Sequence, residues 1–69
     1  MANPLEVGAR VKVYGFGLVD ESEKIMGLFS GERGQIEKIE DLYLADVRME
    51  DGELARVHLI QCMPIENLT

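Results

Sequence analysis

The stretch Gly31-Glu32-Arg33-Gly34-Gln35-Ile36-Glu37-Lys38-Ile39 (GERGQIEKI) admits three interpretations: a phosphate-binding loop, a helix or a bent strand. A phosphate-binding glycine loop leads into a helix and carries a Lys-Ser/Thr pair, which this stretch lacks. A helix here would be short and would begin with a glycine, which is a poor helix former. As a strand, the stretch places Ile36 and Ile39 on opposite faces, unless a bulge or strong twist brings both to the core. We therefore predict that Gly31 and Gly34 form a turn into a sharply bent strand.

A hairpin is predicted immediately after this stretch. Asp51-Gly52 is typical of a tight hairpin turn, because glycine adopts the positive φ that the turn requires. Successive side chains of residues 42–49, before the turn, alternate between two faces as in a strand. Residues 54–57 follow the turn in the same way, so both runs predict strands. The first run directs one set of side chains to one face, namely Tyr43, Ala45, Val47 and Met49, and a second set to the other, namely Leu44, Asp46 and Arg48.

The side chains of residues 7–14 also alternate between two faces, which predicts a first strand that starts from a turn at Gly8. The segment from Gly15 to Gly31 is too long for a loop without structure of its own. It fits a short helix with Asp20 as N-cap and Gly27 at its end. It fits equally well a hairpin-like excursion folded over the mouth of a barrel.

The C-terminal residues 58–65 are too apolar for a free tail. We predict a single helical turn over Leu59–Cys62 and then a short strand over Met63–Ile65. Because proline lacks the N–H needed for a central ladder, Pro64 favours an edge strand.

This order of elements resembles the SH3-like small β-barrel over almost the whole chain. Val7–Val13 resembles the first strand of that group, written G-x-x-V-x-V, and Gly34-Gln35-Ile36 with Ile39 resembles the glycine-to-apolar step of KOW-type barrels. Val57–Ile65 is similar to the endings of small phage and mobile-element proteins. The resemblance implies a mainly β fold: a five-stranded barrel with a long first loop and a helical turn before the last strand. Such barrels bind peptides, RNA, ribosomes or other subunits, so the resemblance does not fix a function.

The size of the chain predicts one domain over residues 1–69 with a small core. Its one cysteine, Cys62, excludes an internal disulfide and fits a reducing compartment. With a single histidine beside that cysteine, a stabilising metal site is not expected. We therefore expect self-association as the remaining source of stability, and no metal or cofactor.

The net charge of −6 argues against general nucleic-acid binding, because it repels a phosphate backbone. No apolar run approaches the length of a membrane span. The start of the chain, Met1–Glu6, has neither the basic residues nor the apolar stretch of a signal peptide. We expect a cytoplasmic protein without a membrane partner.

Catalysis finds little support in the sequence. His58 and Cys62 are spaced to share a face of a helical turn, yet no third residue stands at an obvious spacing to orient the base. Plasmid-borne dihydrofolate reductase shares the small barrel and carries a Val-Gln-Ile-Tyr strand, whereas this chain reads Val57-His58-Leu59-Ile60. We expect no catalytic residues and keep a reductase-like barrel only as a second alternative.

Two surfaces remain as candidates. The long segment holds more apolar side chains than one end of a small barrel buries, and we predict that they bind a protein partner or a second copy: Leu18, Ile25, Met26, Leu28 and Phe29. The alternative is an RNA-binding barrel that uses basic residues beside an aromatic ring, namely Arg10, Lys12, Tyr14 and Arg33. The function expected from the sequence is therefore a non-enzymatic adaptor or inhibitor of phage or mobile-element type.

Overall fold

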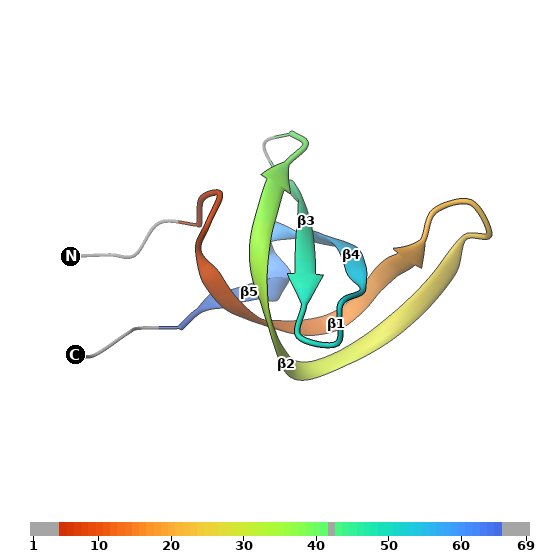
Figure 1. Ribbon diagram of the computed structural model, residues 1–69, viewed down its shortest axis with the longest axis horizontal. Coiled ribbons are helices and arrows are strands. Elements are labelled where there is room, and N and C mark those ends of the chain that lie inside the picture. The colour runs from red at the N-terminus through yellow and green to blue at the C-terminus, as the bar shows by residue number, and fades with distance from the viewer. Residues whose placement is uncertain (1–4, 42, 66–69) are drawn as a thin grey trace.

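A computed structural model describes residues 5–41 and 43–65 of the chain (Figure 1). It is a small closed antiparallel barrel of four strands with one additional strand. The elements are β1 (Arg10–Asp20), β2 (Ile25–Ile39), β3 (Leu44–Met49), β4 (Leu54–His58), the 3-10 turn η1 (Leu59–Gln61) and β5 (Cys62–Pro64). The predicted mainly β, five-stranded barrel with a helical turn before its last strand is confirmed.

The barrel closes through β1. The strands follow the order β2-β3-β4-β1-β5, and β2 also pairs with β1. Strand pairing between β1 and β4 is limited to the pair Leu18–Arg56, while β5 lies beside β1 at residues 11–13. Pro64 pairs with Val11 in this outermost strand, which confirms its predicted place on an edge.

The core consists of apolar side chains from all five strands: Val11, Val13, Ile36, Ala45, Val47, Met49, Ala55, Val57 and Cys62. Of the four residues predicted to share one face, Ala45, Val47 and Met49 all point into the core, whereas Tyr43 is 56% exposed. Tyr43 lies just before β3 begins, where its carbonyl accepts a hydrogen bond from the Leu59 N–H and its ring stacks on His58. The alternation of the strand therefore does not extend to this residue.

The Asp51-Gly52 turn between β3 and β4 is confirmed. Gly52 has a φ of 95°, and its N–H donates to the Met49 carbonyl at 2.9 Å. Arg48 braces the turn, because its Nη1 donates to the Gly52 carbonyl while its Nε donates to Glu37 on β2. The hydrogen bond to Glu37 raises the pKa of the Arg48 guanidinium.

The bent strand predicted around GERGQIEKI is present, with one correction. The register between β2 and β3 shifts between Ile36 and Lys38, and this bulge lets Ile36 enter the core while Ile39 packs against it. The predicted turn at Gly31 and Gly34 is wrong, because β2 passes through both glycines without interruption. Gly31 bends the strand with a φ of 102°, whereas Gly34 is buried where β2 meets β3.

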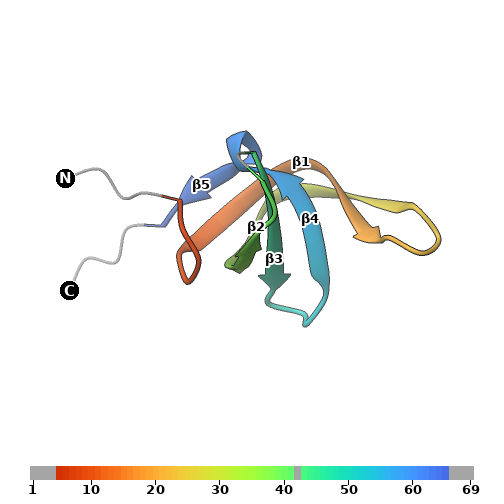
Figure 2. The ribbon, with the colours of Figure 1, turned by 90° about the horizontal axis from the view of Figure 1, so that it is seen from above.

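The segment from Gly15 to Gly31 is a hairpin, and the alternative of a short helix is wrong. β1 and β2 pair along its length, and Figures 1 and 2 show the paired strands extending sideways from the barrel. The Asp20 carboxylate does accept the Ser22 and Glu23 N–H groups, as an N-cap would. Lys24 then adopts a φ of 55° and the chain returns as β2, so the same local hydrogen bonds close a turn instead of starting a helix.

Candidate functional site

The outward side of the β1–β2 hairpin carries a contiguous apolar surface. The register sets Tyr14 opposite Ser30, Phe16 opposite Leu28 and Leu18 opposite Met26, so their side chains share one face of the two-stranded sheet. Phe16 and Leu28 are each 63% exposed and Met26 is 54% exposed. We call the set Tyr14, Phe16, Leu18, Met26 and Leu28 the outer face.

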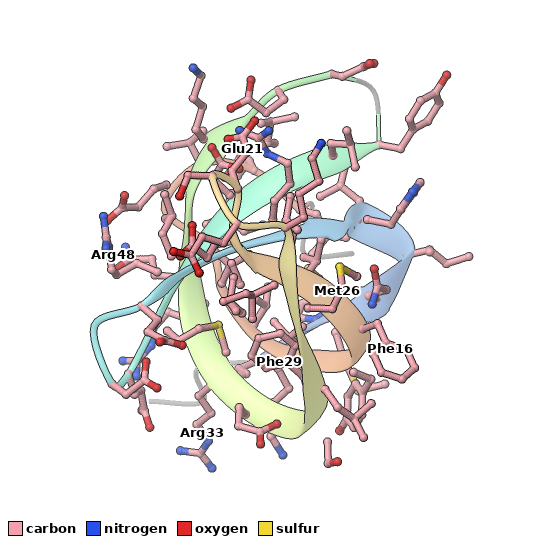
Figure 3. The ribbon with its side chains drawn as sticks, turned by 90° about the vertical axis from the view of Figure 1, so that its right-hand side faces the viewer. Phe16, Glu21, Met26, Phe29, Arg33 and Arg48 are labelled. Carbon is pink, nitrogen blue, oxygen red and sulfur yellow. The ribbon has the colours of Figure 1, made fainter. Side chains whose placement is uncertain are left out.

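The inward side of the hairpin packs on the barrel instead. A Cβ atom on Gly17 would lie 2.5 Å from the Val57 Cγ1 and 3.0 Å from the Phe29 Cε2, so the hairpin approaches β4 closely there and Phe29 covers the gap. Figure 3 shows Phe29 on the opposite side of the hairpin from Phe16 and Met26. Of the five residues predicted to bind a partner, Leu18, Met26 and Leu28 lie on the outer face. Phe29 packs against the core, and Ile25 is exposed at the first residue of β2.

The hairpin is held in place at its base. The Gln61 Nε2 donates to the carbonyls of Tyr14 at 2.8 Å and Phe16 at 2.7 Å. These carbonyls flank Gly15, whose φ of 87° bends β1 at this point. The main chain of β1 on either side of Gly15 is therefore tied to the 3-10 turn η1.

A second anchor links the hairpin tip to the barrel. Arg56 on β4 donates to three carboxylates: Nε to Asp46 at 2.9 Å, Nη2 to Glu40 at 3.1 Å and Nη1 to Glu21 at 3.2 Å. Burial works to raise the pKa of Asp46, but the hydrogen bonds with Arg56 and Glu40 and the charges of Arg56 and Lys38 together outweigh it and hold that pKa below its usual value. These ion pairs therefore tie the hairpin tip, through Glu21, to β4 and to the acidic residues beside it.

One edge of β2 has no strand beside it among the described residues. β3 begins to pair with β2 only at Gly34, so β2 from Ile25 to Glu32 is paired with β1 alone. The Ser30 N–H donates to the Glu32 carboxylate, which shows that main-chain groups at this position point away from β1. A groove of about 400 Å³ runs along this open edge, between β2 and the β3–β4 turn, and is lined by Phe29, Gly31, Glu32, Arg33, Met49, Glu50 and Asp51.

The residues of the alternative nucleic-acid surface also come together. Lys12 lies directly opposite Arg33, and Arg10 and Tyr14 flank Lys12 on the outward side of β1. This basic group adjoins the outer face at the base of the hairpin. At the other end, the hairpin tip carries Asp20, Glu21 and Glu23.

His58 and Cys62, the pair considered for catalysis in the sequence, do not approach each other through their reactive groups. The Cys62 thiol lies 3.8 Å from the His58 main-chain carbonyl and donates to it, so it faces no imidazole nitrogen there. Burial raises the pKa of the Cys62 thiol, which opposes formation of the reactive thiolate. The His58 ring instead stacks on Tyr43, with ring centroids 6.2 Å apart.

Over residues 5–41 and 43–65, no three His, Cys, Asp or Glu side chains are placed to hold a metal ion together. Nor does any helix in this part of the chain have the length and apolar character to cross a bilayer.

Two residues that shape the site were not assigned to it from the sequence. The sequence does not single out Phe16, because its apolar partner Leu28 is identified only once the hairpin register is known. The role of Gln61 in anchoring the hairpin cannot be predicted from its local sequence, since its hydrogen bonds reach carbonyls that lie far away in the chain.

No protein-family model matches this chain, and no curated protein or solved structure matches it significantly.

Proposed function

We propose that this chain is a non-enzymatic protein-interaction module that self-associates through the outer face of its β1–β2 hairpin. The observation that carries the proposal is the cross-strand pair of Phe16 and Leu28, which are each 63% exposed on a hairpin braced by Gln61. Contiguous apolar surface of this kind marks interaction sites in soluble proteins. Because the hairpin is already held in place, little conformational freedom is lost on binding.

The small size of the domain supports the same proposal. A single core of nine residues stabilises a chain of this length only weakly, and burial of the outer face adds to it. The net charge of −6 opposes association of two copies, but salt at about 0.15 M screens charges that lie more than ~8 Å apart.

We place the barrel in the SH3-like group, as a module of phage or mobile-element type that acts in the cytoplasm. The long β1–β2 hairpin, the Asp51-Gly52 turn and the 3-10 turn before β5 support this placement. The free thiol of Cys62 is compatible with a reducing compartment. An adaptor or inhibitor role would use the same outer face toward a different protein.

Sedimentation velocity over a range of concentrations tests self-association. The parent is expected to form dimers or higher assemblies at micromolar concentration, and Leu28→Glu to remain a folded monomer. Tyr43→Glu is the matched control, because it places the same charge on a similarly exposed apolar residue away from the hairpin. A parent that stays monomeric throughout, or a Tyr43→Glu variant that dissociates as fully as Leu28→Glu, would contradict the proposal.

The cross-strand pair of Lys12 and Arg33 favours a second candidate, an RNA-binding barrel. Arg10, Lys12 and Arg33 form a basic surface beside the Tyr14 ring, although the chain as a whole is acidic. This function requires retention on a polyanion resin that falls with salt and is lost in Arg33→Ala. Elution of the parent with the void volume at low salt would eliminate it.

A further inference from the structure

We propose that the open edge of β2 binds an extended segment of a partner protein in which apolar and basic side chains alternate. The segment adds one antiparallel strand beside Leu28 and places arginine or lysine in the groove between β2 and the β3–β4 turn. The groove is lined by Phe29, which lies on the opposite side of the hairpin from Phe16 and Met26 (Figure 3), so this binding does not depend on self-association through the outer face.

The main-chain groups at Leu28 are directed toward the open edge. In an antiparallel pair, successive residues point their N–H and C=O groups alternately toward the partner strand and away from it. The carbonyls of Tyr14 and Phe16 point away from β2, since both accept hydrogen bonds from Gln61. Their partners Ser30 and Leu28 therefore point their own main-chain groups away from β1, toward an edge that no other described strand covers. An unpaired edge of this kind is a template for an added strand.

The usable edge is short and ends at a bulge. The register between β1 and β2 shifts at Gly31, and the Arg33 carbonyl beyond it is already bonded to the β3–β4 turn. Before the bulge, the Glu32 carboxylate accepts the Ser30 N–H. Leu28 therefore supplies the N–H and the carbonyl that no described strand or side chain engages, and a partner strand pairs with β2 around this residue.

The two faces of the hairpin determine the side chains that the segment carries. Residues directly opposite one another in an antiparallel pair place their side chains on the same face of the sheet. The residue that faces Leu28 therefore lies beside the outer face, where an apolar side chain fits. Its two neighbours in the segment point to the opposite face, on which Phe29 lines the groove of about 400 Å³.

The groove favours a positive charge on these two neighbours. Its apolar lining residues, Phe29 and Met49, suit the methylene stem of a lysine or arginine. Its charged lining residues are three exposed acids and one base, namely Glu32, Glu50, Asp51 and Arg33. In the described part of the chain Glu50 is engaged only through its main-chain N–H, so its carboxylate is placed to accept a charge-assisted hydrogen bond. The net charge of −6 also draws a cationic segment toward the protein.

Six-residue peptides with blocked ends test both the charge and the strand pairing. One peptide alternates valine with arginine, and its control alternates valine with glutamate. Fluorescence anisotropy of dye-labelled peptide is expected to show binding of the arginine peptide that weakens with added salt, and no binding of the glutamate peptide. In ¹H–¹⁵N spectra at fixed protein concentration, the arginine peptide is expected to shift the amides of residues 26–30.

N-methylated forms of the arginine peptide test the direction of its main chain. The valines face Leu28, so their N–H groups point toward β2, and N-methylation of the valines is expected to weaken binding by more than about 10-fold. The N–H groups of the arginines point to solvent, and their N-methylation is expected to leave the affinity nearly unchanged. A valine-methylated peptide that binds as tightly as the unmodified one would overturn strand addition.

Two protein variants test the groove. Glu50→Gln and Glu53→Gln each remove one negative charge from the β3–β4 turn, but only Glu50 lines the groove. Glu50→Gln is expected to weaken binding of the arginine peptide by about 2- to 5-fold, and Glu53→Gln to leave it nearly unchanged. Equal effects of the two variants, or a glutamate peptide that binds as tightly as the arginine peptide, would overturn a basic segment as the occupant.

The same titrations separate this site from other occupants. Peptide binding that weakens as the protein concentration is raised would assign the edge to a second copy and overturn the proposal. An arginine peptide that does not bind at millimolar concentration would remove the site, whatever sedimentation velocity shows for Leu28→Glu and the outer face.

Discussion

Gly34→Ala gives the sharpest test of how GERGQIEKI shapes the barrel. A Cβ atom at this position would lie 2.6 Å from the Val47 Cγ1, 2.8 Å from the Arg48 carbonyl oxygen and 3.0 Å from the Met49 Sδ. One of these neighbours is main chain within a paired strand, so it does not rotate away. Overpacking of this kind costs about 1–3 kcal/mol, while the loss of glycine freedom in the unfolded chain returns ~0.4–1 kcal/mol.

The net loss of roughly 1–2 kcal/mol corresponds to a fall of about 4–16 °C in the melting temperature of a domain this small. Thermal unfolding followed by circular dichroism measures it. Gly27→Ala is the matched control on the same strand, because its nearest neighbour at 2.9 Å is a side-chain methyl of Val19 and the next atom lies 3.6 Å away. We expect Gly27→Ala to change the melting temperature little. A Gly34→Ala variant that melts with the parent would refute the close approach of β2 to β3.

Three further predictions follow from individual residues. Gly52→Val should lower the melting temperature by several degrees through backbone strain of ~1–3 kcal/mol alone, since nothing lies within 4 Å of a Cβ there; an unchanged value would count against the positive φ. The pKa of Asp46 is lowered in the folded chain, so its stabilising pairing with Arg56 is complete above the unfolded pKa of about 3.9 and is lost as the pH falls through the lower folded value. A plot of melting temperature against pH should therefore be flatter below pH ~4 in Asp46→Asn than in the parent, and parallel curves would contradict this assignment. Burial raises the pKa of the Cys62 thiol, so iodoacetamide should alkylate it slowly in the native protein and readily in denaturant, as mass spectrometry would show; rapid native labelling would contradict its place in the core.

The parts of the fold that were predicted from the sequence depend on local chemistry. The Asp51-Gly52 turn follows from the φ that only glycine adopts readily, and the bulge after Ile36 follows from the spacing of two isoleucines in a strand. These features require no knowledge of distant neighbours. The single turn before β5 was placed to within one residue for the same reason, because Pro64 limits where the last strand can lie.

The sequence does not decide between a helix and a hairpin for residues 15–31, because the turn lacks the residues usual for a hairpin. Lys24, rather than glycine or asparagine, adopts the positive φ, and Asp20 makes hydrogen bonds that suit a helix start as well as a turn. Asp46 was assigned to a face without a buried role, yet it is 6% exposed. Its burial depends on the register that brings Arg56 across from it, which the sequence of one strand does not reveal.

The outer face was only partly predicted for a related reason. Leu28 and Phe29 are neighbours in the sequence and equally apolar, but adjacent residues of a strand point to opposite faces. The register decides that Leu28 joins Phe16 outside while Phe29 covers Gly17 inside.

The most direct test of the hairpin as the interaction surface is a dilution series followed by amide chemical shifts in ¹H–¹⁵N spectra. We predict that shifts depend on concentration along the paired segments 14–18 and 26–30, while those of β3 stay constant. Shifts that do not change with concentration, or changes centred on Tyr43 and Met63 instead, would contradict the account.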